Sequence, residues 1–109
     1  MRHRRVTYSS EATFHALADP TRRALLDLLR QGSQPAGQIA SAFPVSRPAI
    51  SKHLRLLHRA GLVETRKAGT ASICTLSAQP LRMVDDWLND YQKFWRESLA
   101  SLKKHMEEQ

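Results

Sequence analysis

The stretch that decides the fold runs from residue 46 to residue 63 and reads SRPAISKHLRLLHRAGLV. At 100° per residue, Ile50, Leu54 and Leu57 gather on one side of a predicted helix over residues 46–61. The opposite side is polar and cationic, and the whole predicted helix contains no carboxylate. A solvated helix usually includes glutamates that pair with lysine or arginine four residues away. The missing acids therefore favour a surface that faces phosphate.

The first turns of this predicted helix carry the side chains best placed to read a sequence. Ser46 can cap the helix, and Pro48 is tolerated because the first helical residues have no intrahelical partner for their N–H groups. The N-terminal residues of a recognition helix in the major groove reach the base edges. Since an arginine there can bond O6 and N7 of guanine, we expect Arg47 and Ser51 to contact bases. Ser46 and Pro48 are expected to lie against the DNA beside them.

The later polar residues of the same helix have a different expected task. Lys52 and Arg55 lie farther round the cationic side, and we expect them to bind phosphates, which position a protein without specifying sequence. His53 falls on the apolar side instead. A packed, hydrogen-bonded histidine is therefore the preferred interpretation, and a contact to a base is the alternative.

Two helices are predicted ahead of the cationic one. Asp19-Pro20 combines an N-cap acceptor with a proline at the first helical position, and Gly32 is expected to close that helix as a left-handed C-cap. Its inner side is predicted to hold Leu25, Leu26, Leu28 and Leu29, and its outer side Arg22, Arg23, Asp27 and Arg30. Residues 33–35 then open a short helix whose inward residues are Ile39, Ala40 and Phe43. Because residues 44–46 allow only a sharp turn, the short helix and the cationic helix fit a helix-turn-helix.

After the cationic helix the pattern changes from helix to strand. Residues 62–66 and 71–76 are predicted strands, and residues 67–70 form the turn of a β-hairpin between them. A hairpin directly after a recognition helix is a wing, and Arg66 and Lys67 at its shoulders are expected phosphate contacts. Cys74 on the return strand is interpreted as a structural thiol, because no basic residue is near in sequence to lower its pKa.

The two ends of the chain carry the expected dimer contacts. Residues 1–8 are predicted to form a flexible basic arm, followed by a short helix capped by Ser9 or Ser10. Pro80 starts a last helix, residues 80–107, which would extend ~40 Å and exceed what a domain of this size can cover. Its aromatic stripe is typical of an interface, and a small-molecule pocket is the alternative. The expected dimer interface comprises Phe14, Leu17, Val84, Trp87, Leu88, Tyr91, Phe94 and Trp95.

The bulk properties narrow the class of protein. A length of 109 residues suits one domain, expected over residues 9–109, and a single cysteine excludes an intrachain disulfide. Residues 1–67 carry twelve Lys/Arg and four Asp/Glu, against five and six in residues 68–109. The basic front is expected to bind a polyanion, with nucleic acid favoured over an anionic membrane. Neither a signal peptide nor a membrane span of ~20 apolar residues is present, so we expect a cytoplasmic protein.

The stretch over residues 46–63 resembles the recognition helix of ArsR/SmtB-type winged-helix repressors, and the run ADPTRR at residues 18–23 resembles the start of that family's second helix. The resemblance covers roughly residues 10–105. It implies a mainly α fold of five helices with a β-hairpin wing, and a homodimer formed through the first and last helices. The implied function is repression through an inverted-repeat operator in double-stranded DNA.

The resemblance does not include the family's metal-sensing motifs. Its cysteine-based sensors carry Cys-x-Cys on the third helix, where this chain reads GQIAS at residues 37–41. Its zinc sensors place Asp-x-His and His-x-x-Glu on the last helix, where this chain has only the second half, at His105 and Glu108. We therefore expect no metal and no cofactor, and leave open an unknown small-molecule effector.

Other function classes have less support. An RNA-binding module would need aromatic residues interleaved with the basic ones for stacking on unpaired bases, and the cationic helix has none. A protein–protein adaptor would use the aromatic last helix to bind a different protein. An enzyme is not expected, because no phosphate-binding glycine loop or nucleophile–base arrangement is present, and Asp85-Asp86 fits a solvated helix flank.

Overall fold

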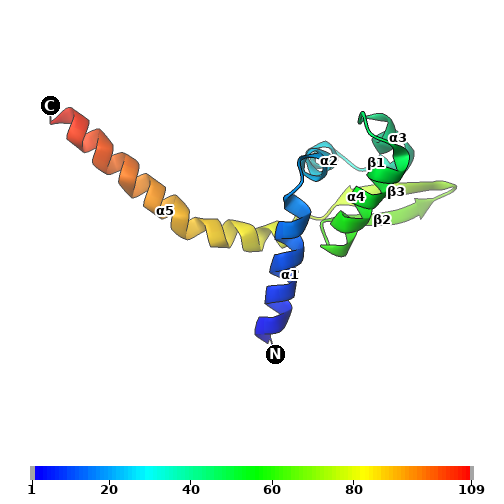
Figure 1. The fold of residues 1–109 in the computed structure, drawn as a ribbon, viewed down its shortest axis with the longest axis horizontal. Helices are drawn as coiled ribbons and strands as arrows, with labels where there is room; N and C mark the ends of the chain where they lie inside the picture. Colours follow the sequence, from blue (N-terminus) through cyan, green and yellow to red (C-terminus); the bar gives the residue numbers. More distant parts are fainter. Residues whose placement is uncertain (1, 109) are drawn as a thin grey trace.

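The computed structural model describes the backbone of residues 2–108 and the side chains of residues 10–108. Along these residues the elements are α1 (Arg2–Leu17), α2 (Pro20–Arg30), β1 (Gln34–Pro35), α3 (Ala36–Ser41), α4 (Arg47–Arg59), β2 (Val63–Ala68), β3 (Ala71–Leu76) and α5 (Gln79–Glu107) (Figure 1). The fold is the predicted winged helix-turn-helix with five helices. None of the described helices is long and apolar enough to cross a membrane.

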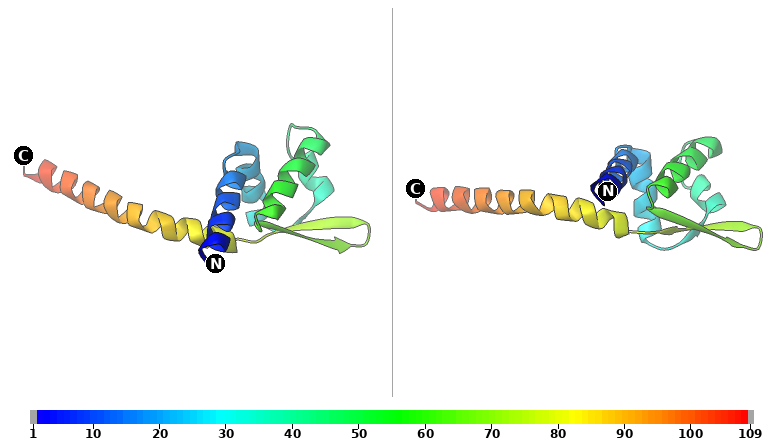
Figure 2. Two further views of the ribbon diagram at one scale, coloured as in Figure 1. Left: turned by 60° about the horizontal axis from the view of Figure 1, so that its bottom comes forward. Right: turned by 90° about the horizontal axis from the view of Figure 1, so that it is seen from below.

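The molecule is elongated because α5 projects away from the packed body (Figure 2). Its extents are 65 × 39 × 21 Å and its radius of gyration is 18.5 Å. A compact domain of about 100 residues has a radius of gyration of ~13 Å. Much of α5 therefore has no cover from its own chain.

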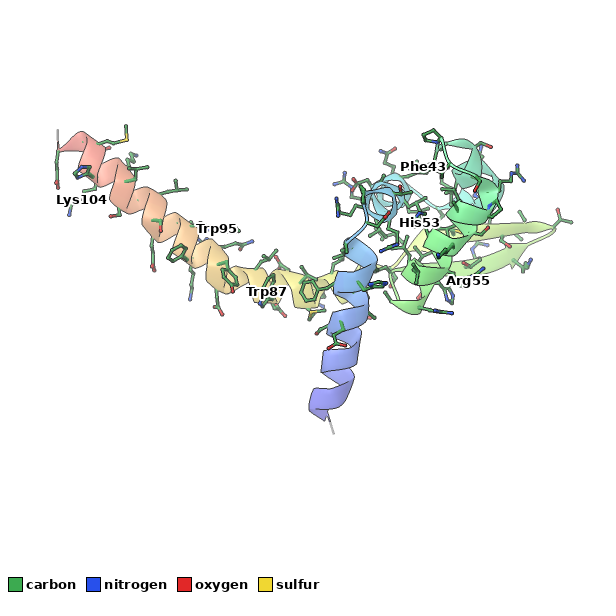
Figure 3. The ribbon with its side chains drawn as sticks, viewed as in Figure 1. Phe43, His53, Arg55, Trp87, Trp95 and Lys104 are labelled. Carbon is green, nitrogen blue, oxygen red and sulfur yellow. The ribbon has the colours of Figure 1, made fainter. Side chains whose placement is uncertain are left out.

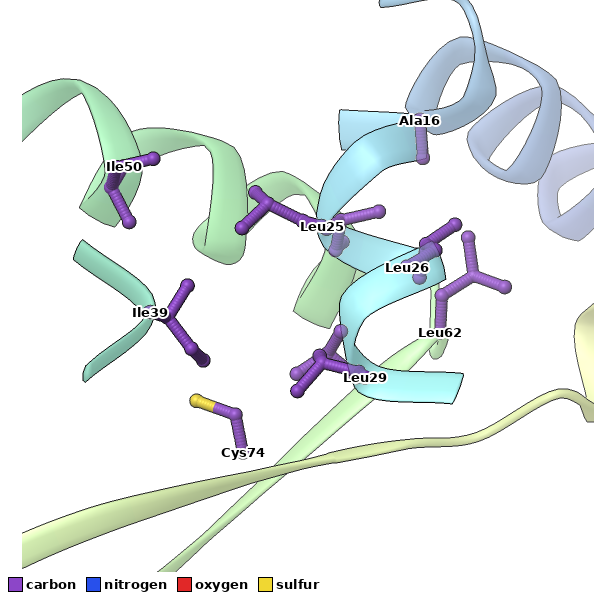
Figure 4. Packing of buried hydrophobic residues seen from close by; sticks show 10 residues of the cluster. Ala16, Leu25, Leu26, Leu29, Ile39, Ile50, Leu62 and Cys74 are labelled. Carbon is purple, nitrogen blue, oxygen red and sulfur yellow. The ribbon is translucent and has the colours of Figure 1, made fainter. Parts of the chain in front are cut away.

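The core lies where α2, α3 and α4 meet one face of the sheet (Figure 4). α2 contributes Leu25, Leu26 and Leu29, as its predicted leucine side requires, and each is at most 7% exposed. The other buried apolar residues are Ala16, Ile39, Ile50, Leu57, Leu62, Val63 and Cys74. Each large side chain contributes about 1.5–3 kcal/mol by leaving water. Since Ile50 and Leu57 anchor α4, its cationic side is left facing outward.

The predicted starts of α2 and α4 are confirmed. The Asp19 carboxylate accepts a hydrogen bond from the Arg22 N–H at 3.0 Å, with proline at the first position of α2. The Ser46 hydroxyl accepts one from the Ala49 N–H at 3.2 Å and caps α4. Gly32 follows the C-cap residue Gln31 with a positive φ of 153°, which favours glycine, but this differs from the φ of about 57° of the predicted left-handed C-cap, so that prediction is wrong.

The predicted start of α1 and the predicted exposure of Arg22 are also wrong. α1 begins at Arg2, not at Ser9 or Ser10, and residues 2–8 contain neither glycine nor proline that would interrupt a helix. The backbone of residues 2–8 forms the first turns of α1, and Met1 and Gln109 lie outside the described residues. Arg22, predicted on the outer side of α2, is buried at 7% exposure, because carbonyl oxygens at the end of α1 accept hydrogen bonds from it.

The predicted β-hairpin is confirmed as β2 and β3, and β1 adds a third strand that we did not predict, giving an antiparallel sheet in the order β1-β3-β2. β1 is a two-residue strand in which Gln34 pairs with Cys74, and it replaces the predicted start of the third helix. In the hairpin, Ala68 pairs with Ala71, so the turn is Gly69-Thr70 rather than the predicted four residues. Gly69 has a φ of 65°, which suits the first position of a tight type II′ turn.

Candidate DNA interface

The side chains predicted to contact DNA from α4 lie together on one exposed side of that helix. All five are exposed, namely Arg47, Pro48, Ser51, Lys52 and Arg55. The Ser46 cap fixes where the helix begins, so Arg47 occupies its first position and Pro48 its second. Figure 3 shows His53 on the side of α4 toward α2, and Arg55 on the other side. The surface opposite the core is therefore polar and cationic.

The two predicted phosphate contacts of the hairpin, Arg66 and Lys67, lie on opposite faces of the sheet. Residues paired across antiparallel strands share a face, and successive residues alternate. Lys67 therefore lies on the same face as Thr65, which pairs with the core residue Cys74. Arg66 lies on the other face, beside Glu64. The prediction treated the two residues alike, but only Lys67 belongs to the face of the sheet that α4 covers.

A shallow hollow separates α4 from the hairpin. Its volume is about 270 Å³. Ser51, Arg55 and His58 of α4 line one side, and Thr65 and Ser72 of the hairpin line the other. Two of the predicted DNA contacts, Ser51 and Arg55, thus adjoin the wing directly. This hollow could not be predicted from the sequence, because it forms between distant segments.

His53 occupies the position predicted from the apolar side of its helix. It is partly buried, and its Nδ1 accepts a hydrogen bond from Arg22 Nη1 at 3.4 Å. The same nitrogen lies 3.8 Å from an oxygen of Asp19. The pKa of Asp19 is lowered, chiefly by the hydrogen bond from the Arg22 N–H and further by the positive charge of Arg22. The packed, hydrogen-bonded histidine is confirmed.

Cys74 lies inside the core, as a structural thiol should. It is 2% exposed, and burial raises its pKa, against a smaller opposing effect of a hydrogen bond with Thr65. A raised pKa disfavours the thiolate, which is the reactive form. Among the side chains that the structure describes, those of residues 10–108, no three His, Cys, Asp or Glu come together in a group that could hold a metal ion.

The residues expected at the dimer interface divide into two groups. Phe14, Trp87, Tyr91, Phe94 and Trp95 are exposed, and Leu99, Leu102 and Met106 continue the exposed apolar stripe toward the end of α5. Phe14 meets Trp87 edge-on with ring centroids 5.4 Å apart, and Trp87 meets Tyr91 at 5.2 Å. The others, Leu17, Val84 and Leu88, are half-buried within one protomer. Leu17 packs against the core of its own chain.

A basic recognition helix followed by a wing defines the class of winged helix-turn-helix DNA-binding proteins. A protein-family model, that of the helix-turn-helix domain, matches residues 17–66. The transcriptional regulator Rv2034 of Mycobacterium tuberculosis is 40% identical over 95 residues, which cover 86% of each chain. The transcriptional repressor SdpR of Bacillus subtilis is 37% identical over 78 residues, covering 72% of this chain and 87% of SdpR.

Solved structures agree with this class. The crystal structure of the ArsR family transcriptional regulator RHA00566 matches with a TM-score of 0.74 and 33% identity, over 83% of this chain and 93% of that one. The homodimeric winged helix-turn-helix domain Mb0332 of Mycobacterium bovis matches with a TM-score of 0.67 and 25% identity, over 99% of this chain and 91% of that one. The chain belongs to the ArsR family of DNA-binding transcriptional regulators, which are not enzymes.

Proposed function

We propose that this protein represses transcription by binding an inverted-repeat operator as a homodimer, with α4 of each protomer in the major groove. The observation that carries the proposal is the carboxylate-free, exposed cationic side of α4 next to the wing. With 13 residues, α4 is ~20 Å long, and the major groove, ~12 Å wide, admits a helix. Repression agrees with the name of the relative SdpR.

In this proposal some exposed residues of α4 and the wing contact bases, and others contact phosphates. Arg47 and Ser51 read base edges, and Ser46 and Pro48 hold the start of the helix close to the groove. Lys52, Arg55 and Lys67 bind phosphates on the side of the wing that α4 covers, and Arg66 binds phosphate from the opposite face of the wing. With about six to eight phosphate contacts per dimer, log K should fall with log salt at a slope of about −5 to −7.

The homodimer is proposed to form through α1 and α5. The support is the exposed aromatic stripe of α5, since contiguous apolar surface of this kind usually marks an interface. The solved relative Mb0332 is homodimeric. A protein acting on chromosomal DNA in this way would work in the cytoplasm.

Two arginine variants test the division of roles. Duplexes selected from a random pool supply the operator, and binding of wild type, Arg47→Ala and Arg55→Ala is then measured on the operator and on random duplex. Arg47→Ala should lose affinity for the operator by about 1–3 kcal/mol per half-site and keep its affinity for random duplex. Arg55→Ala should weaken binding to both duplexes by a similar factor. Equal losses on both duplexes for Arg47→Ala would remove it from the base-reading role.

The same selection separates the competing functions. Selected duplexes without an inverted repeat would contradict a two-fold dimer, and tighter binding to single-stranded RNA would favour an RNA-binding module. Dimerisation of the purified chain would argue against an adaptor that needs a different protein. We also propose that a resident metal is not required, so treatment with a chelator should leave operator affinity unchanged, whereas a metal-dependent change would contradict this.

A further inference from the structure

Arg22 connects the end of α1 to the recognition helix from a buried position. Its Nε donates to the Ala16 carbonyl at 2.8 Å, and its Nη2 donates to the His15 carbonyl at 2.9 Å. Its Nη1 donates to Nδ1 of His53 on α4 at 3.4 Å. One side chain thus binds α1 with two nitrogens and α4 with the third.

The chemistry of these groups makes the connection stiff. The last carbonyls of a helix have no intrahelical partner and carry partial negative charge, which favours a cation. The guanidinium is planar, so its donors keep fixed directions relative to one another. Asp19 completes the cluster, because its carboxylate caps α2 through the Arg22 N–H and lies 3.8 Å from His53 Nδ1. We call Asp19, Arg22 and His53 the interhelix joint.

The joint lies between the two surfaces that operator binding would need. On one side, Phe14 precedes His15 directly in α1 and meets Trp87 of α5. On the other side, His53 lies on α4 between Lys52 and Leu54, with the cationic surface one residue away. Arg22 therefore bonds α1 to the recognition helix at the place where the two helices meet.

A small change in that angle would matter in a two-fold dimer. A tilt of ~5° over a lever of ~20 Å displaces each recognition helix by ~2 Å, and two-fold symmetry doubles the change in their separation to about one base-pair step of ~3.4 Å. Half-sites of a dimeric helix-turn-helix protein lie about one helical turn apart, so the separation decides which spacing is accepted.

We propose that the interhelix joint, with Arg22 at its centre, is a positioning site that determines the half-site spacing of the operator. The inference rests on the proposed dimeric operator binding. Arg22 does not contact DNA in this mechanism, because its three nitrogens face α1 and α4 inside the protomer.

The test uses the full chain and duplexes carrying the selected half-sites with the spacer shortened, unchanged or lengthened by one base pair. His53→Leu removes the α4 side of the joint and leaves Arg22 bonded to α1, so it is less disruptive than a change at Arg22. His53→Asn keeps an acceptor for the guanidinium. Arg23→Gln is the matched control, because exposed Arg23 also bonds to the end of α1, donating to the Leu17 carbonyl at 2.8 Å, and it lies outside the interhelix joint.

Wild type should prefer one spacing by at least about tenfold, the scale of a single lost base-pair contact. His53→Leu should reduce that preference to within about threefold while keeping its affinity for random duplex and its thermal unfolding temperature. His53→Asn should restore much of the preference, and Arg23→Gln should match wild type.

Three results would overturn parts of this account and can be told apart. An unchanged spacing profile in both His53→Leu and Arg22→Gln would refute the joint as a positioning site. A uniform loss of affinity at every spacing, together with a lower unfolding temperature, would show a structural role only and refute it as well. A wild-type protein without any spacing preference would refute the proposed dimeric operator binding, and this inference with it.

Discussion

Replacing Trp95 by alanine should weaken the dimer without weakening the protomer. Trp95 is 52% exposed in one chain, and it lies farther along α5 than Trp87, which packs next to α1 (Figure 3). A large aromatic side chain presents up to ~250 Å², so about 120–130 Å² of Trp95 is available to a partner. At ~25 cal/mol per Å², complete burial of that area would contribute about 3 kcal/mol.

A symmetric dimer contains the residue twice, so the substitution acts twice. If the partner covers half of the exposed area on each copy, the loss is about 3 kcal/mol per dimer, or ~150-fold in the dimer dissociation constant. Sedimentation equilibrium measures this constant, and circular dichroism should show no loss of helix, because alanine favours helix more than tryptophan does. Lys93→Ala, exposed on another side of α5, is the control and should change the constant little. A Trp95→Ala dimer as tight as wild type would refute the proposed interface.

Three further predictions concern the cap, the thiol and the phosphate contacts. Because the folded-state pKa of Asp19 is lowered, its contribution to stability is present above the unfolded pKa of about 3.9 and is lost as pH falls through the folded pKa. Asp19→Asn should therefore flatten the acid-side decline of the unfolding free energy in urea titrations from pH 3 to 7, and an unchanged pH profile would contradict this. The Cys74 thiol should react with an aromatic disulfide reagent far more slowly in the native chain than in urea, since burial raises its pKa and blocks access; equal rates would show that the site opens. Lys52→Ala should make the slope of log K against log salt less steep by about 1.8 per dimer, because each lost phosphate contact is worth about 0.9; an unchanged slope would remove Lys52 from the phosphate contacts.

Local signals in the sequence were enough to predict most of the helical framework. An acceptor followed by an early proline determines where α2 and α4 begin, because both effects act within one helical turn. The apolar spacing of Ile50 and Leu57 likewise determines which side of α4 is buried. The exposed cationic side follows from that assignment without any knowledge of tertiary structure.

Features that depend on contacts between distant segments could not be predicted in this way. The strand β1 has only two residues and exists because β3 offers a pairing edge, with Ser33 Oγ 2.8 Å from Thr75 Oγ1 beside it. Nothing within residues 33–35 indicates a strand. The opposite faces of Arg66 and Lys67 follow from the strand register, which depends on where the two-residue turn falls.

Arg22 is an instructive error because the sequence did contain a signal. It lies three, four and seven residues before Leu25, Leu26 and Leu29, which places it on the buried stripe of α2. A charged residue is usually exposed unless it is paired, and its partners here are carbonyl oxygens of α1. Those partners exist only after α1 and α2 dock. The helical spacing therefore indicates that Arg22 is buried, but only the tertiary structure explains how its charge is paired there.

The dimer surface and the DNA surface should also depend on each other thermodynamically. A single protomer can hold an operator through only one α4, whereas pairing makes the second half-site contact intramolecular. Because coupling between two binding equilibria is reciprocal, the factor by which dimerisation strengthens operator binding equals the factor by which the operator strengthens the dimer. Operator DNA with the preferred spacing should therefore restore much of the dimer that Trp95→Ala loses, and DNA with one additional base pair should restore less. That difference arises only if the angle between α1 and α4 is held stiffly, which is the role assigned to Arg22.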